Sequence, residues 1–184
     1  LYLSDNQKVQ VLAAKHENKM ILNVDKIKEL LIDKLVYPLY HLDFEATNKA
    51  IPLFKGASPN QFFVYQFSVD VEPLKGKVKH HEYLHLKKTD PRREVATRLI
   101  AVCGKVGTIT VWNKTFEQSR IREMANALPD LADALTALND RMVDLEDIFK
   151  GKYLYHHDLQ GSSSIKYVLP FLCPDLDYSR DFVR

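Results

Sequence analysis

Residues 61–86 read QFFVYQFSVDVEPLKGKVKHHEYLHL, and this stretch sets the architecture of the chain. Residues 61–71 are aromatic and β-branched almost throughout, which is typical of a central strand buried on both faces. Residues 72–77, EPLKGK, contain a proline and a glycine and predict a hairpin turn. Residues 78–86 should therefore return as an antiparallel strand.

The segments on either side of this hairpin extend the sheet and add helices. Residues 36–47 have the rhythm of another strand. After the hairpin, Asp90 as N-cap and Pro91 at the first helical position predict the start of a helix. Residues 108–112 predict a short strand that runs into further helical spacing, which continues to Leu145. We expect an α/β fold with a mixed sheet, an antiparallel three-stranded meander and flanking helices.

The chain is expected to contain one helical arm and one domain. Its 184 residues are 46% hydrophobic and can form the core of a single domain. Apolar residues at helical spacing predict an N-terminal helical arm over residues 1–36, which leaves residues 37–184 for the domain. Because the sequence begins at Leu1 rather than Met, we expect it to be part of a longer protein whose other domains are its partners.

Composition favours a soluble protein without a strong overall field. The net charge is +2, which does not by itself indicate a nucleic-acid partner, although seven Lys and Arg residues gather between positions 75 and 93. Cys103 and Cys173 have no second Cys or His at metal-ligand spacing and are expected to be reduced, buried thiols of a cytoplasmic protein. No apolar run approaches the roughly 20 residues that a membrane span needs.

The letters HEYLH at residues 81–85 match the H-E-x-x-H pattern of zinc metalloproteases. That chemistry requires both histidines on one face of a helix, one turn apart. In a strand the two positions lie about 13 Å apart, at roughly 3.3 Å per residue, which is too far for one ion. The hairpin turn before this segment and the helix start after it favour the strand, which leaves the protease as the third and least favoured hypothesis.

The strand over residues 36–47 places two carboxylates on one face. Residues two apart in a strand point the same way, so Asp43 and Glu45 share a face with His41 while the intervening residues face the core. Like charges side by side cost free energy unless a cation neutralises them, and hard oxygen ligands favour Mg²⁺ or Mn²⁺. The pattern predicts a divalent-metal site; two solvated carboxylates at a strand end are the alternative.

A second acidic position lies in TVWNKTFEQSR, residues 110–120, where a strand runs into a helix. Asn113 or Thr115 is the expected N-cap, with Glu117 in or near the first turn. Glu117 either interacts with the helix dipole or belongs to a site, because α/β proteins place functional side chains at such junctions. Asp144, in DRMVDLEDI, is expected on a helix face in a solvated or capping role.

These residues carry a resemblance to a known group of enzymes. Asp43-Phe44-Glu45, followed by Asn113, Phe116 and Glu117, resembles the first two motifs of DEDD-type 3′-5′ exonucleases, which have a ribonuclease H-like fold. Longer blocks resemble a bacterial family of uncharacterised domains related to those nucleases. These blocks are YPLYHLDFEAT, FVYQFSVDV, DPRREVATRLI, WNKTFEQSR, NDRMVDL and GSSSIKYVLP, within about residues 37–178.

The resemblance implies a ribonuclease H-like nuclease domain over residues 37–184. Its activity would be divalent-metal-dependent phosphodiester hydrolysis, expected of a 3′-5′ exonuclease on single-stranded DNA or RNA ends. Asp43, Glu45 and Glu117 would be the catalytic and metal-binding residues of a two-metal Mg²⁺ or Mn²⁺ site. The alternative is a catalytically inactive ribonuclease H-like module that binds nucleic acid or serves in the assembly of a larger protein.

Further residues are expected to contact substrate. They are Asn113, Ser162, Ser164 and Lys166. In GSSSIK, residues 161–166, hydroxyls, backbone N–H groups and an ammonium can contact a phosphate, and an ordinary capped helix is the alternative. His156 and His157, in the preceding loop, are expected to be exposed.

The sequence departs from the nuclease pattern at two points. Glu117 stands where most relatives have the shorter Asp. The final motif, in which a Tyr or His precedes a last metal-binding Asp, is expected beyond Arg184, so this chain would lack it. Tyr178-Ser179-Arg180-Asp181 is similar, but its spacing is one residue short, and the role is not carried over.

Overall fold

The computed structural model describes residues 2–16 and 19–176. The chain forms two compact units: one is Leu35–Asp144, and the other combines the described parts of residues 1–34 and 145–184. The boundary after Lys34 lies two residues before residue 36, where the predicted helical arm ends. The second division falls inside the predicted domain, because the chain after Asp144 groups with the N-terminal helices.

The first unit, called the sheet unit below, is built on five strands in the order β4-β3-β2-β5-β6. Antiparallel pairing joins β2 to β3 and β3 to β4, which confirms the predicted meander. Parallel pairing joins β5 to β2 and β6 to β5, so the sheet is mixed. The strands are β2 Leu39–Asn48, β3 Phe62–Glu72, β4 Lys79–Leu84, β5 Thr108–Val111 and β6 Met142–Asp144.

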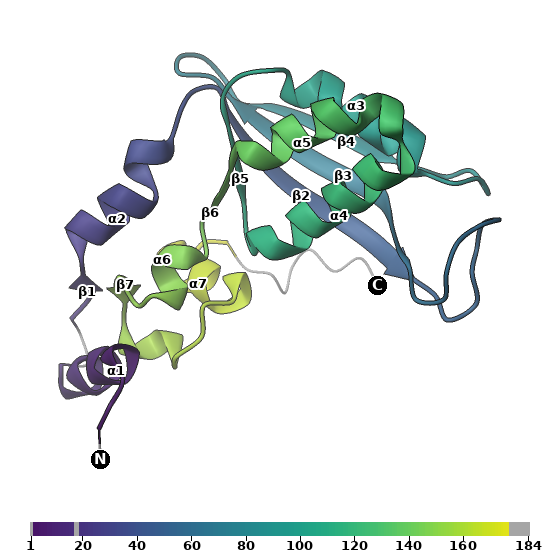
Figure 1. Ribbon diagram of the computed structural model, residues 1–184. Coiled ribbons are helices and arrows are strands. Elements are labelled where there is room, and N and C mark those ends of the chain that lie inside the picture. Colours follow the sequence, from purple (N-terminus) through teal and green to yellow (C-terminus); the bar gives the residue numbers. More distant parts are fainter. Residues whose placement is uncertain (1, 17–18, 177–184) are drawn as a thin grey trace. The chain divides into compact units, whose positions relative to one another are not determined.

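Helices cover one face of this sheet, as Figure 1 shows. They are α3 Arg92–Cys103, α4 Lys114–Ala127, η2 Pro129–Leu131 and α5 Ala132–Asp140. Beneath them lies a core of fully buried side chains such as Phe67, Leu99, Ile109, Ile121 and Leu135. Burial of each such side chain contributes about 1.5–3 kcal/mol, which holds the sheet and the helices together.

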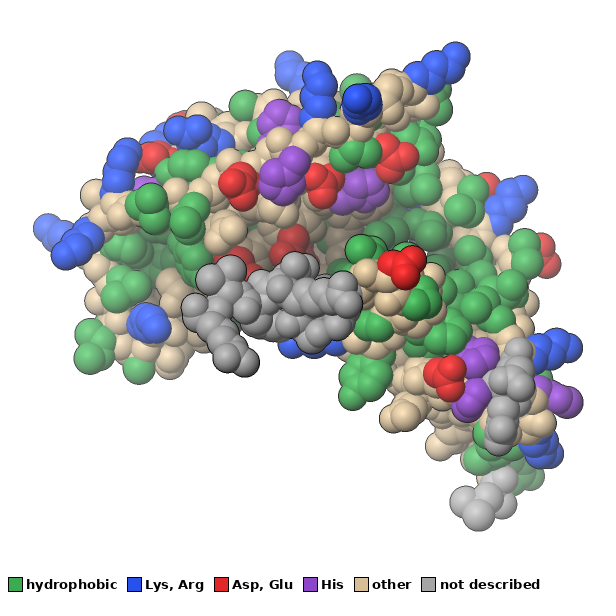
Figure 2. Space-filling model, turned by 180° about the vertical axis from the view of Figure 1, so that it is seen from behind, with side chains coloured by type: hydrophobic (Ala, Val, Ile, Leu, Met, Phe, Trp, Pro, Cys, Tyr) green, Lys and Arg blue, Asp and Glu red, His purple; other side chains and the backbone are tan. Residues whose placement is uncertain are grey.

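The opposite face of the sheet is polar. Along β2 the residues Tyr40, Leu42 and Phe44 are buried in the core while Asp43 and Glu45 are exposed, which confirms the predicted alternation. Figure 2 shows acidic and histidine side chains gathered on this face. They include two histidine–carboxylate hydrogen bonds, His41 Nε2 to Glu72 Oε2 at 3.1 Å and His80 Nδ1 to Asp70 Oδ1 at 2.8 Å.

The HEYLH segment lies in the last strand of the meander. β4 comprises Lys79–Leu84, and the backbone N–H of His85 donates to the carbonyl of Tyr65 in β3 at 2.8 Å. The two histidines of the motif are therefore in extended chain, where they cannot converge on a metal as one helical turn would allow. The structure confirms the strand and excludes the protease interpretation.

Two local predictions need correction. The segment RMVDL was predicted to be helical, but α5 ends at Asp140 and Met142–Asp144 forms β6. Asp144 is therefore on a strand rather than on a helix face. At the start of α3 the N-cap position is Pro91, one residue after the predicted Asp90. Asp90 still has a capping role, since its carboxylate accepts the Arg92 N–H at 3.0 Å.

The second unit consists of short elements. They are α1 Asp5–Lys15, β1 Ile21–Leu22, α2 Val24–Leu30, η1 Ile32–Lys34, α6 Asp147–Lys150, β7 Leu154–Tyr155, η3 His157–Leu159 and α7 Ile165–Leu172. Strands β1 and β7 pair antiparallel and join the N-terminal segment to the C-terminal one. Of the two cysteines, Cys103 is buried as predicted, but Cys173 is exposed. In neither unit do the described residues form a helix long and apolar enough to cross a membrane.

Candidate functional site

The two predicted carboxylates of β2 lie on the open face of the sheet. Asp43 and Glu45 both point away from the core, and the register between β2 and β3 shifts between Glu45 and Ala46. Such irregularities are frequent beside active sites, where they redirect a side chain. Asp43 reaches solvent, yet the protein atoms around it raise its pKa by desolvation, opposed by a hydrogen bond from the backbone of Phe44.

Glu117 is placed differently, inside the first turn of α4. The residue is only 3% exposed. Its Oε2 atom is buried, and no hydrogen-bond partner for it occurs among the residues that the structure describes. A buried carboxylate oxygen without a partner costs free energy, because it has lost its water and gained nothing in exchange.

The pKa of Glu117 likewise indicates that the charged carboxylate is unfavourable in this position. Burial raises this pKa from its ordinary value of 4.5 to about 7, and the negative charges of Asp43 and Asp144 add to the increase. The backbone N–H of Glu117 and the guanidinium of Arg120 act in the opposite direction. Asp43, Glu117 and Asp144 thus belong to one electrostatic neighbourhood, which is called the carboxylate group below.

Asp144 caps the helix that carries Glu117. Its carboxylate accepts the backbone N–H of Asn113 at 3.0 Å and that of Lys114 at 2.9 Å. Asn113 occupies the N-cap position in the left-handed conformation, with φ 73°, and its own side chain makes no capping bond. An acid from the end of β6 therefore replaces the predicted side-chain cap of Asn113 or Thr115.

The carboxylate group can supply ligands to a hard cation, but its oxygen atoms are too far apart to surround the ion by themselves. Among the described residues, the set of three or more His, Cys, Asp or Glu whose ligand atoms all lie within 4.8 Å of one another is His156, His157 and Asp158. Asp43, Glu45 and Glu117 are more widely spaced than that. Mg²⁺ usually retains several waters and binds through one or two carboxylates, which suits spaced ligands.

The predicted substrate-binding residues occupy both units. Asn113 precedes Glu117 in the sheet unit, while Ser162, Ser164 and Lys166 lie in the other unit. Ser164 caps α7, since its hydroxyl accepts the Lys166 N–H at 3.4 Å, and the Ser162 hydroxyl accepts the Ser164 N–H at 3.1 Å. These bonds are those of the ordinary capped helix, and contact with phosphate stays a prediction. Residues 178–181 lie outside the described part of the chain.

The prediction that His156 is exposed is wrong. His156 is 8% exposed, and its ring stacks on Phe171 of α7 with centroids 4.9 Å apart. His157 is half-buried beside it, with ring centroids 4.5 Å apart. The loop gave no periodic signal for this burial, which depends on Phe171, fifteen residues further along the chain.

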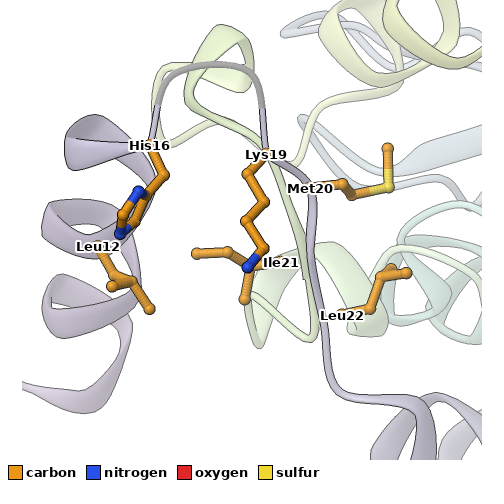
Figure 3. Close-up of a pocket in the computed structure, with 6 residues that line it drawn as sticks. All are labelled: Leu12, His16, Lys19, Met20, Ile21 and Leu22. Carbon is orange, nitrogen blue, oxygen red and sulfur yellow. The ribbon is translucent and has the colours of Figure 1, made fainter.

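A separate pocket lies in the second unit and is shown in Figure 3. Its lining is mainly apolar, with one imidazole and one ammonium group. The lining residues are Leu12, His16, Lys19, Met20, Ile21 and Leu22. Its described lining residues include none of the predicted site residues and no carboxylate.

The fold and site therefore define a mixed α/β domain with acidic side chains on an open sheet face and at a strand-to-helix junction. Residues 40–164 match the model of a family described as Domain of unknown function (DUF2779), and the chain belongs to that family. This confirms the predicted bacterial family of uncharacterised domains, while its relation to DEDD-type exonucleases stays a prediction.

Two curated relatives are themselves uncharacterized proteins. One, from Ureaplasma parvum serovar 3, is 30% identical over 82% of this chain and 24% of its own length. The other, from Mycoplasma genitalium, is 28% identical over 76% of this chain and 23% of its own length. The chain thus spans about a quarter of the length of these relatives. No solved structure matches it.

Proposed function

We propose that this chain carries out divalent-metal-dependent phosphodiester hydrolysis, as a 3′-5′ exonuclease on single-stranded DNA or RNA ends. The fold that we assign to the sheet unit is ribonuclease H-like. Its antiparallel meander, continued by two parallel strands and covered by helices, supports that assignment.

The observation that carries the proposal is the state of Glu117. Its buried Oε2 has no partner among the described residues, and the pKa of the carboxyl is raised to about 7 by burial and by two neighbouring acids. A purely structural glutamate at a helix start would be expected to lie in solvent, whereas only its own backbone N–H and the guanidinium of Arg120 oppose the rise in the pKa of Glu117. A bound divalent cation would instead neutralise Glu117 and Asp43 together.

The chain's own residues have distinct roles in this proposal. Asp43 and Glu117, from two different elements, would hold the divalent ions, and Glu45, the next outward-facing residue of β2, would be a further ligand. Asp144 positions Glu117 by fixing the first turn of α4 through Asn113 and Lys114. Two bound ions would supply an activated water and stabilise the leaving oxygen of the phosphodiester.

The basic residues near the meander suit a polyanionic substrate. Lys75, Lys77 and Lys79 are exposed on and beside the β3–β4 turn. Others of the basic run are engaged in ion pairs, such as Arg93 with Asp130 at 2.8 Å. The turn lysines can therefore attract phosphate groups, an attraction that weakens as salt increases.

The test is digestion of end-labelled single-stranded DNA and RNA with Mn²⁺ or Mg²⁺, by the chain and by a version extended past Arg184. We expect Asp43→Asn to lower the rate by more than about 100-fold, because it removes a metal ligand. Glu82→Gln changes an exposed acid on β4, which is separated from β2 by β3; it is the matched control and should leave the rate unchanged.

Equal rates for the Asp43→Asn variant and the parent would overturn the choice of site. If the extended protein binds single strands but releases no nucleotides with either ion, the alternative of a catalytically inactive binding module replaces the enzyme proposal.

A further inference from the structure

We propose that His156, His157 and Asp158 form a binding site for a divalent transition-metal ion of the zinc class. The three residues are consecutive and begin η3 in the second unit. Their candidate ligand atoms all lie within 4.8 Å of one another. Small side-chain adjustments would bring such atoms onto one ion, since zinc binds imidazole nitrogen at about 2.0–2.1 Å and carboxylate oxygen at about 2.0–2.2 Å.

The first histidine is held in place by its surroundings. His156 is buried, and its ring stacks nearly parallel on Phe171, at an interplanar angle of 25°. The ring of His157 lies against that of His156. A ligand whose ring is fixed by packing loses little conformational freedom when it binds a metal, so the site is partly preorganised.

The Asp158 carboxylate lies close to both imidazole rings. Asp158 Oδ2 lies 3.3 Å from His156 Nδ1, and Asp158 Oδ1 lies 3.0 Å from His157 Nε2. The Asp158 N–H also donates to His156 Nδ1 at 3.3 Å, a long bond that an ion at this nitrogen would replace. Two nitrogens and a carboxylate thus converge, as the ligands of a metal ion do.

The other nitrogen of His157 lacks a hydrogen-bond partner among the described residues. This nitrogen, Nδ1, is buried. A buried ring nitrogen normally has a partner. One ion binds one nitrogen of an imidazole, and Nε2, which faces Asp158, is the His157 nitrogen nearest the other two ligands.

The donor set selects the class of metal. Two imidazoles with one carboxylate suit Zn²⁺ and similar transition ions, whereas Mg²⁺ prefers oxygen ligands alone. Three protein ligands leave a fourth zinc position for water or for another group. This proposal does not rest on the proposed function, whose metal ligands are Asp43, Glu45 and Glu117.

The test is calorimetric titration of the chelator-treated chain with Zn²⁺, together with the absorption spectrum of the Co²⁺-loaded protein. We expect about one tight site, with the Co²⁺ spectrum of tetrahedral coordination. His157→Gln and Asp158→Asn should each weaken Zn²⁺ binding by at least about 10-fold. Both side chains are partly exposed, so these variants should fold, which circular dichroism checks.

His81→Gln, which changes an exposed histidine of β4, is the matched control and should bind Zn²⁺ like the parent. Equal affinity in the parent, His157→Gln and Asp158→Asn would overturn the proposal, as would the absence of Zn²⁺ binding by the parent. Asp43→Asn should retain Zn²⁺ binding, so failure of this site and failure of the nuclease proposal are distinguishable.

Discussion

The carboxylate group of the sheet unit and the histidine group of the second unit hold metal-ligating side chains in opposite ways. Asp43, Glu117 and Asp144 come from three elements and offer only oxygen, and mutual repulsion helps to raise the pKa of Glu117. His156–Asp158 is a contiguous run that offers nitrogen and oxygen and is fixed by stacking. The ligand atoms and their spacing, rather than the number of acids, therefore determine the ion that each group suits: Mg²⁺ or Mn²⁺ for the carboxylate group and Zn²⁺ for the histidine group.

The largest expected effect is a loss of affinity for one ion, Mn²⁺ or Zn²⁺, when one of the two groups is changed. Asp43→Asn should weaken Mn²⁺ binding by about 100-fold and leave Zn²⁺ affinity unchanged, because it removes an oxygen ligand of only one group. His157→Gln should weaken Zn²⁺ binding by at least about 10-fold and leave Mn²⁺ affinity unchanged. Calorimetric titrations of both variants with both ions measure this. If either variant weakens the binding of both ions, the two groups are not separate sites.

A change in the pH dependence of stability is expected for Glu117→Gln. The folded pKa of Glu117 is raised above its unfolded value, so the folded state binds the proton more tightly. The free energy of unfolding therefore falls as pH rises from about 4.5 to about 7, and the loss is complete above that range. Gln stays neutral, so at pH 8 without metal the variant should be more stable by up to about 3 kcal/mol.

Urea unfolding at pH 5 and pH 8 measures this difference. Glu45→Gln, which changes an exposed acid on the open face of β2, should alter stability by less than about 0.5 kcal/mol at either pH. A Glu117→Gln variant that loses stability equally at both pH values would show that the carboxylate is not under electrostatic strain.

A smaller effect is expected for Asp144→Asn, which separates helix capping from metal binding. The change weakens two hydrogen bonds to the start of α4 and should lower the free energy of unfolding by about 1–2 kcal/mol, with or without divalent ions. Thermal unfolding measures this, with Asp140→Asn as an exposed control. If the loss appears only when Mn²⁺ is present, Asp144 is a metal ligand rather than a cap.

The sheet unit could be predicted because its signals are local. The residues of β2 alternate between core and solvent, so Asp43 and Glu45 could be placed on one face from the sequence alone. Glu117 could be placed in the first turn of α4 from the strand and the capping residues before it. The proline and glycine of residues 72–77 predicted the hairpin turn of the meander, which is again a local signal.

Other features depend on contacts between distant segments. β6 is three residues long, too short for a periodic pattern, and its Asp144 caps a helix that begins thirty residues earlier in the chain. The burial of His156 depends on Phe171 in another helix. The grouping of residues 1–34 with the chain after Asp144 involves the pairing of β1 with β7, two strands of two residues each.

The pKa of Glu117 with and without Mg²⁺ is the quantity on which the nuclease proposal depends. An NMR titration of ¹³C-labelled glutamate, assigned by Glu117→Gln, measures it in solution. Burial should raise this pKa to about 7 in the absence of metal, and a cation bound by Asp43 and Glu117 should lower it by at least about 1 unit. A pKa that Mg²⁺ leaves unchanged would show that Glu117 holds no metal, and the proposed site would be wrong.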